Sequence, residues 1–283
     1  PPGRRNLIFA IKQAGVPLGG MVAALLLPSL SERIGWQGAI AASTLLFAAI
    51  AMPLLWRIPR WDDDRDPTVR LGASGLAGLS TIFASPLLTA LAITGCCYAG
   101  YQFCLIAFTI TMLVTELGWP LVDAGLAATA VQISGIAGRI GWSLLADRIG
   151  RGIEILVGIG LASVAFGLLT ASIGPGWPPA AIVATLIGFG CCIVGWNGVY
   201  MGQTTRASGP ALAGLATGGV LVFNFIGVIF APAAFALVSK LTGSFAATYA
   251  VFAVMPLIGA AALIRALRLS PPGSTRAAGA APD

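Results

Sequence analysis

The chain contains no histidine, and only 9% of its 283 residues are charged. Soluble globular domains usually contain about a quarter charged residues, so this composition argues against a soluble protein. The hydrophobic share is 57%, which is more than the core of a soluble protein of this length needs. A membrane accounts for the surplus, because side chains that face lipid must be apolar as well as those that face the core.

Residues that build catalytic and metal sites are also scarce. The apolar runs contain no histidine and no clustered carboxylates, so we expect no catalytic residues, no metal site and no cofactor. The one acidic cluster, in residues 62–66, is interleaved with arginines as in a solvated linker. The five cysteines lie within apolar runs and have no zinc or disulfide spacing, which indicates small packing residues.

Eight apolar segments are long enough to cross a membrane as helices, which takes about 20 residues each. They cover residues 7–29, 36–56, 86–114, 121–146, 153–173, 178–203, 211–237 and 244–267. We therefore expect an all-α integral membrane protein with eight transmembrane helices. Its expected parts are two helices in residues 1–56, a cytoplasmic central loop in 57–85, six helices in 86–267 and a disordered cytoplasmic tail in 268–283.

The basic residues support this count and give it an orientation. If the N-terminal end is cytoplasmic and the loops alternate, all of the 16 Lys and Arg except Arg33 and Lys240 fall on the cytoplasmic side. Cytoplasmic loops are enriched in Lys and Arg, and a missed helix would scramble the later loops. Basic residues that lie singly or in pairs between apolar runs do not indicate nucleic-acid binding. The start of the chain, the central loop and the tail are thus expected in the cytoplasm, with the chain in a bacterial inner (plasma) membrane.

One motif occurs twice. Residues 95–102 and 190–197 both read Gly-Cys-Cys-x-x-Gly-aromatic-amide. The two copies are three expected helices apart, so they cross the membrane in opposite directions. Inverted repeats of this kind are typical of secondary transporters, whose sites form where the repeats meet.

A second motif carries a family resemblance. Residues 143–151 read Ser-Leu-Leu-Ala-Asp-Arg-Ile-Gly-Arg, which resembles the cytoplasmic loop signature of the major facilitator superfamily, with serine in place of the usual first glycine. The resemblance implies a conformational-switch loop formed by Ser143, Asp147, Arg148, Gly150 and Arg151, in which Asp147 latches one access state. From the residues alone, Asp147 is expected to accept hydrogen bonds or to lie near the N-terminal end of a neighbouring helix. The alternative is a solvated loop whose charges only set the topology.

The same resemblance implies twelve helices in two halves, of which this chain would contain helices 5–12 and lack the first four. A weaker match supports this numbering. Residues 15–20 are similar to the family's helix-5 Gly/Pro motif, through Gly15, Pro17, Gly19 and Gly20, although the spacing is one residue short of the antiporter form. The expected partners are then the missing N-terminal helices of the same parent protein, the lipid bilayer and a small-molecule substrate.

Polar residues inside the expected helices are the candidates for substrate binding. An unpaired amide in hydrocarbon costs several kcal/mol, so such groups face protein or a water-filled cavity. A neutral hydrogen-bonding cavity is one interpretation, and interhelical contacts that hold the helices together are the other. The candidate residues are Tyr98, Gln102, Gln132, Trp196, Asn197 and Asn224.

Embedded charge is almost absent. Lys12 and Arg139 are expected to extend to the cytoplasmic surface, and no Asp or Glu lies at mid-membrane depth. Ion coupling would then lie in helices outside this chain, or the carrier would be a facilitator. We expect a secondary active or facilitative transporter of a small polar solute that works by alternating access. A membrane-embedded enzyme and an inactive truncated remnant are the alternatives.

Overall fold

A computed structural model describes residues 5–58 and 74–269. Within these ranges the secondary structure is helical throughout and contains no strand. The helices are α1 (Arg5–Gln13), α2 (Gly15–Leu55), α4 (Ser74–Phe83), α5 (Pro86–Leu117), α6 (Leu121–Ile149), α7 (Gly152–Ala171), α8 (Pro179–Ile193), α9 (Asn197–Thr242), α10 (Phe245–Phe252) and α11 (Val254–Leu269).

Six helical stretches of the described residues are long and apolar enough to span a membrane, which confirms an all-helical integral membrane fold. They are Gly15–Leu55, Pro86–Leu117, Leu121–Ile149, Gly152–Ala171, Pro179–Thr242 and Phe245–Leu269. Two of these stretches are interrupted at a glycine whose backbone is not helical. Gly35 has φ 74° and ψ 163°, and Gly209 has φ 72° and ψ 168°. Glycine adopts this region without the steric penalty of a Cβ atom, so the chain can reverse at both positions.

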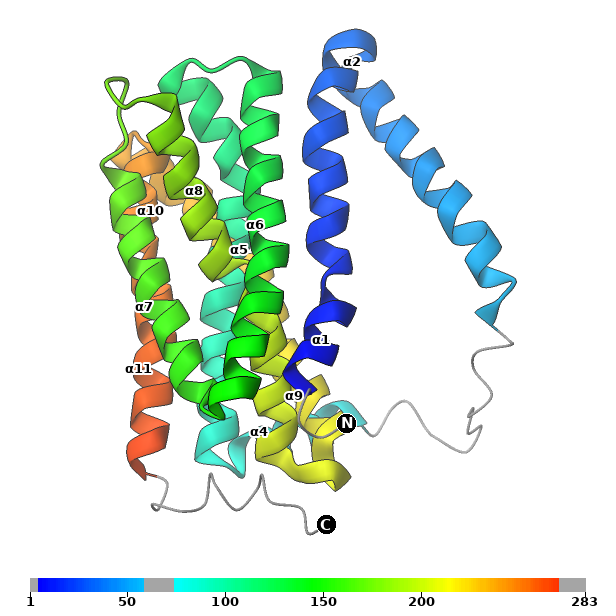
Figure 1. Cartoon of the computed structure of the whole chain (residues 1–283), viewed down its shortest axis with the longest axis vertical. Helices are drawn as coiled ribbons and strands as arrows, with labels where there is room; N and C mark the ends of the chain where they lie inside the picture. The colour runs from blue at the N-terminus through cyan, green and yellow to red at the C-terminus, as the bar shows by residue number, and fades with distance from the viewer. Residues whose placement is uncertain (1–4, 59–73, 270–283) are drawn as a thin grey trace.

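The helices form an elongated bundle with α2 beside it (Figure 1). The first leg of α2 lies along the bundle next to α6, and its second leg, after Gly35, splays away from it. The start of α1, the α6–α7 turn, the bend at Gly209 and the end of α11 all lie at one end, the lower end in Figure 1. We call this the Asp147 end, after the residue in the last turn of α6.

Two of the differences from the expected helix boundaries concern residues that were expected to be loops. Residues 57–85 were expected to be a loop, but Ser74–Phe83 form α4, which packs against α9. Small residues permit this contact, since a Cβ at Gly78 would meet the backbone of Leu215 and Gly219. Helix α6 extends three residues beyond its expected end and stops at Gly150, whose φ of 71° ends it in a left-handed cap. Residues 59–73 and 270–283 of the expected loop and tail lie outside the described residues.

The second copy of the repeated motif breaks a helix, whereas the first does not. Residues 95–102 lie within the continuous helix α5, but α8 ends at Ile193 and α9 begins at Asn197. The segment expected over 178–203 therefore consists of two helices joined by a turn, within the long stretch Pro179–Thr242. The turn at 194–196 leaves backbone carbonyls of α8 without helical partners, and α6 supplies donors to them. The indole of Trp142 donates to the Cys191 carbonyl at 2.9 Å.

Candidate functional site

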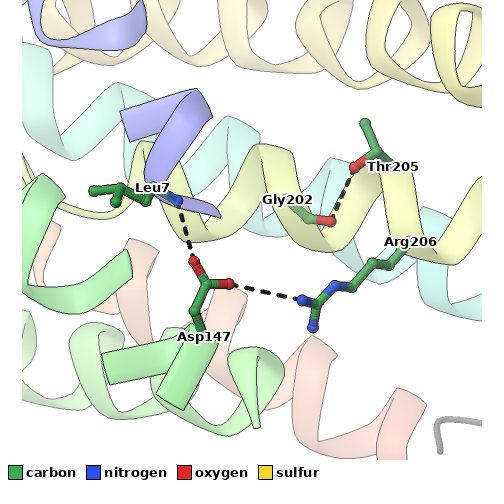
Figure 2. A network of polar contacts seen from close by, with 5 residues as sticks. All are labelled: Leu7, Asp147, Gly202, Thr205 and Arg206. Atoms are coloured by element: carbon green, nitrogen blue, oxygen red, sulfur yellow. Dashed lines mark hydrogen bonds and ion pairs between the residues drawn. The ribbon is translucent and has the colours of Figure 1, made fainter. Parts of the chain in front are cut away.

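Asp147 connects three helices at the Asp147 end of the bundle (Figure 2). One carboxylate oxygen accepts the backbone N–H of Leu7, in the first turn of α1, at 3.3 Å. The other lies 3.7 Å from the guanidinium of Arg206 on α9. The Asp147 side chain is only 8% exposed, so solvent screens these contacts weakly. A carboxylate at the N-terminal end of α1 faces the positive end of the helix dipole, one of the two environments that the sequence predicts for it.

The other signature residues lie in different surroundings. Gly150 ends α6 as described above, and Arg148 and Arg151 are exposed beside it. Ser143 is fully buried, and its hydroxyl has no hydrogen-bond partner among the described residues. Ser143 takes the place of the first glycine of the family signature, and nothing in the structure explains this replacement. The signature is therefore largely the last two turns of a helix and not a loop.

Four of the predicted substrate-binding residues meet near the middle of α5. The side-chain oxygen of Gln102 accepts the indole N–H of Trp196 at 2.9 Å and the amide of Asn197 at 3.5 Å. Tyr98 packs edge-to-face against Trp196, with ring centroids 5.5 Å apart, and its hydroxyl donates to the Leu156 carbonyl at 2.9 Å. The structure thus brings the two copies of the motif into direct contact. In this conformation their polar groups bind each other.

Asn224 belongs to the same cluster through a residue that the sequence interpretation missed. The hydroxyl of Tyr200 donates to the Asn224 side-chain oxygen at 3.1 Å, and the Tyr200 ring packs on Trp196 with centroids 4.7 Å apart. Both partners face Gly95, where a Cβ would overlap the Tyr200 hydroxyl and the Asn224 oxygen. Tyr200 follows Trp196 by one helical turn, so the i, i+4 spacing could have identified it.

Gln132 lies apart from this cluster. It lines a cavity of about 190 Å³ between α2, α5 and α6, whose other walls are apolar except for Thr109. Its side-chain oxygen is buried and has no hydrogen-bond partner among the described residues. Gly20 of the helix-5 motif faces it closely, since a Cβ there would overlap the Gln132 amide nitrogen. Gly15 and Gly19 have open space around them.

Arg139 contradicts its expected placement. It was expected to extend to the surface, but Arg139 is 1% exposed, less than any other charged residue in the described part of the chain. Its Nε donates to the Val194 carbonyl at 3.0 Å, and its Nη1 donates to the Gln13 carbonyl at 2.6 Å. Both acceptors are backbone carbonyls that the helix break and the helix-5 motif leave free, so no local feature of the sequence around Arg139 predicts them. Nothing is described of the Lys12 side chain.

Comparisons with known proteins agree with this architecture. The family model described as Major Facilitator Superfamily matches residues 1–232. Two MFS-type transporters of Mycobacterium tuberculosis, from the strains CDC 1551 / Oshkosh and H37Rv, are each 26% identical over 280 residues. These matches cover 98% of this chain and 60% of each relative, so the chain spans about 60% of the length of the curated relatives that it matches.

Solved structures show the same fold. The crystal structure of the E. coli fucose:proton symporter FucP aligns with a TM-score of 0.61 at 16% identity, covering 84% of this chain and 58% of the symporter. A structure of FucP in the outward conformation aligns with a TM-score of 0.68 at 14% identity, covering 94% of this chain and 69% of FucP.

Proposed function

Because the chain belongs to the major facilitator superfamily, we propose that it moves a small polar solute across the membrane by alternating access, with Asp147 as the latch of one access state. The observation that carries this proposal is the position of the Asp147 carboxylate. It joins the end of α6 to the first turn of α1 and to Arg206 of α9. These contacts close one end of the bundle between the first helices and the six-helix part, so they must break for that end to open.

The topology of the proposal has eight membrane crossings. Helix α2 has 41 residues and would be about 60 Å long if straight, twice the roughly 30 Å of a hydrocarbon core. Division at Gly35 and at Gly209 turns the six long stretches into eight segments of suitable length. Under this division the Asp147 end is cytoplasmic. Helices equivalent to the first four of the family, from the same parent protein, would complete the bundle. The length of the relatives supports this part of the proposal.

The substrate cavity is proposed between the two motif copies and Gln132. Gln102 and Asn197, with Tyr98 and Trp196 as flat walls, would exchange their mutual contacts for contacts with a solute, and Asn224 would support them. The direct Gln102–Asn197 contact supports a shared site, since both groups reach one point from antiparallel helices. The carrier is proposed to work in the inner membrane of a bacterium. The relatives from Mycobacterium tuberculosis and the apolar helices support this location.

Replacement of Asp147 by asparagine tests the proposal. The amide keeps the shape and can still accept the Leu7 N–H, but it removes the charge that faces the α1 dipole and Arg206. A partly buried charge at a helix end stabilises the latched state by about 1–2 kcal/mol. Its removal should therefore reduce the ratio of the latched to the unlatched state roughly 5- to 30-fold. We expect turnover in proteoliposomes to fall, while equilibrium binding of a transported solute changes little.

Arg265, an exposed basic residue in the last two turns of α11, is the matched control when it is replaced by glutamine, and it should leave turnover unchanged. A large loss of binding affinity in Asp147→Asn would assign Asp147 to the substrate site instead. Normal turnover in Asp147→Asn would contradict the latch.

A further inference from the structure

Arg139 is the least exposed charged residue that the structure describes, and its hydrogen-bond partners are uncharged backbone carbonyls. It lies on α6 two turns before Asp147. In the described part of the chain it has no carboxylate within ion-pair distance, and its guanidinium donates to two backbone carbonyls. A buried charge without a counter-ion is costly, and residues of this kind inside membrane proteins mark ligand pathways.

The two carbonyls are available because helices end or are interrupted beside Arg139. The carbonyl of Gln13 would normally accept the N–H of residue 17, but residue 17 is proline and has no N–H. Val194 caps the C-terminal end of α8 at the break in the second motif copy. Each helix C-terminal end carries partial negative charge, which offsets part of the cost of burying the guanidinium. The carbonyls hold Arg139 in place without neutralising its charge.

The location of Arg139 connects it to the proposed cavity and to the proposed movement. Arg139 follows Gln132 by seven residues, so the two side chains lie on the same face of α6, about 10 Å apart along the axis. Gln132 lines the cavity between α2, α5 and α6. The Gln13 carbonyl belongs to α1, whereas Val194 belongs to the six-helix part. Separation of α1 from α6 therefore withdraws one of the two acceptors and leaves Nη1 free toward the widening cavity.

We propose that Arg139 is the recognition residue for a carboxylate group of the transported solute, and that the Gln13 carbonyl takes the place of this carboxylate in the closed state. The inference rests on the proposed transport function and names the substrate class of the same cavity. A carboxylate accepts two parallel N–H bonds from guanidinium and supplies the missing negative charge, so it binds Arg139 more strongly than a carbonyl does. The side chain thus exchanges a weak partner in its own protein for a stronger partner in the substrate.

The test uses the full-length protein, purified in detergent, with acetate, benzoate and succinate as probes and their primary amides as neutral counterparts. Thermal stabilisation, followed by tryptophan fluorescence, measures binding. We expect at least one carboxylate to stabilise the protein while its amide does not. Arg139→Gln should weaken that carboxylate roughly 10- to 100-fold, since hydrogen bonds to charged groups contribute about twice as much as neutral ones. Arg139→Lys keeps the charge but loses the planar fork. Its carboxylate affinity should therefore lie between that of the wild type and that of Arg139→Gln.

A second variant tests the exchange of partners and does not depend on removal of the arginine. Pro17→Ala restores an N–H that can bind the Gln13 carbonyl. This N–H would share the carbonyl oxygen with Arg139 and so weaken the competing acceptor. Carboxylate binding should then tighten several-fold, an effect that a purely structural arginine would not produce. Trp142→Phe is the matched control, because Trp142 donates to a carbonyl of the same helix break but carries no charge. It should leave the preference for carboxylate over amide unchanged.

The outcomes separate this inference from the proposed function. Failure of every carboxylate to stabilise the wild type, equal binding by Arg139→Gln, or unchanged affinity in Pro17→Ala would each overturn it. If proteoliposomes take up neutral solutes independently of Arg139, the transport function is supported and carboxylate recognition by Arg139 is refuted. If a carboxylate binds through Arg139 but does not cross the membrane, the binding site is supported and its transport is refuted. Size-exclusion profiles of the variants verify that each one is folded.

Discussion

The contact between the two motif copies leads to a quantitative prediction about Gln102 and Trp196. Gln102→Leu would leave the indole N–H of Trp196 buried without a partner, since Trp196 is fully buried and donates to the Gln102 side-chain oxygen at 2.9 Å. An unpaired buried donor costs about 1–3 kcal/mol, whereas hydrogen bonds between membrane helices average roughly 0.6 kcal/mol. We therefore expect Gln102→Leu to lower the free energy of unfolding by about 1–2 kcal/mol.

Trp196→Phe should cost a similar amount, because the Gln102 oxygen then keeps only the 3.5 Å contact with Asn197. The double variant removes donor and acceptor together, so it should be more stable than the sum of the single changes predicts by about 0.5–1.5 kcal/mol. Reversible unfolding in mixed micelles measures all three variants. Trp142→Phe, combined with Gln102→Leu, is the control pair and should be additive because the two residues share no partner.

Strict additivity of Gln102→Leu and Trp196→Phe would refute the hydrogen bond as a contributor to stability. Binding measurements on the double variant distinguish the two roles that the sequence leaves open for Gln102, which are substrate contact and interhelical contact. If Gln102 only holds the helices together, the double variant keeps its affinity for a transported solute. If Gln102 contacts the solute, affinity falls even though the helices remain joined.

Two further predictions concern helix contacts outside this cluster. Gly20→Ala places a Cβ on the Gln132 amide, so it should lower the melting temperature and reduce the free energy of unfolding by about 1 kcal/mol. Gly19→Ala is the control, because Gly19 has open space around it, and it should change neither quantity. Equal melting temperatures of the two variants would contradict the close packing of α2 on α6. Glu116 accepts the backbone N–H groups of Phe245 and Ala246 at the start of α10. Glu116→Gln should weaken this cap by about 0.5–2 kcal/mol and speed hydrogen exchange near residue 245, and unchanged protection there would argue against the cap.

Much of the fold follows from apolar length and charge. The all-helical membrane class, the family and the proximity of the two motif copies were predictable, because lipid restricts each span to a helix and parity fixes which helices are antiparallel. The reversal near Gly209 was also predictable from the Gly-Pro pair. Helix α4 was not, since its small residues resemble a linker until α9 provides a surface for them.

The environment of Arg139 could not be predicted for a different reason. Extension to the surface is the usual solution for an arginine near a helix end. Here a proline in α2 and a break between α8 and α9 free two carbonyls. These carbonyls are 126 and 55 residues from Arg139 along the chain, and only the packing of the helices brings them to it. Arg206 was predicted only as a basic residue of a cytoplasmic connection, because its proximity to Asp147 depends on the path of α9.

The most direct test of the account measures the distance between α1 and the end of α6 in the full-length protein. Spin labels introduced with non-canonical amino acids at Ile8 and Ile149, which are 50% and 52% exposed, report the separation across the Asp147 contact by pulsed electron resonance. Alternating access predicts a short and a long distance population in lipid. Asp147→Asn should increase the long population, and Arg265→Gln should change neither population. A single distance that is the same in the wild type and in Asp147→Asn would contradict the account.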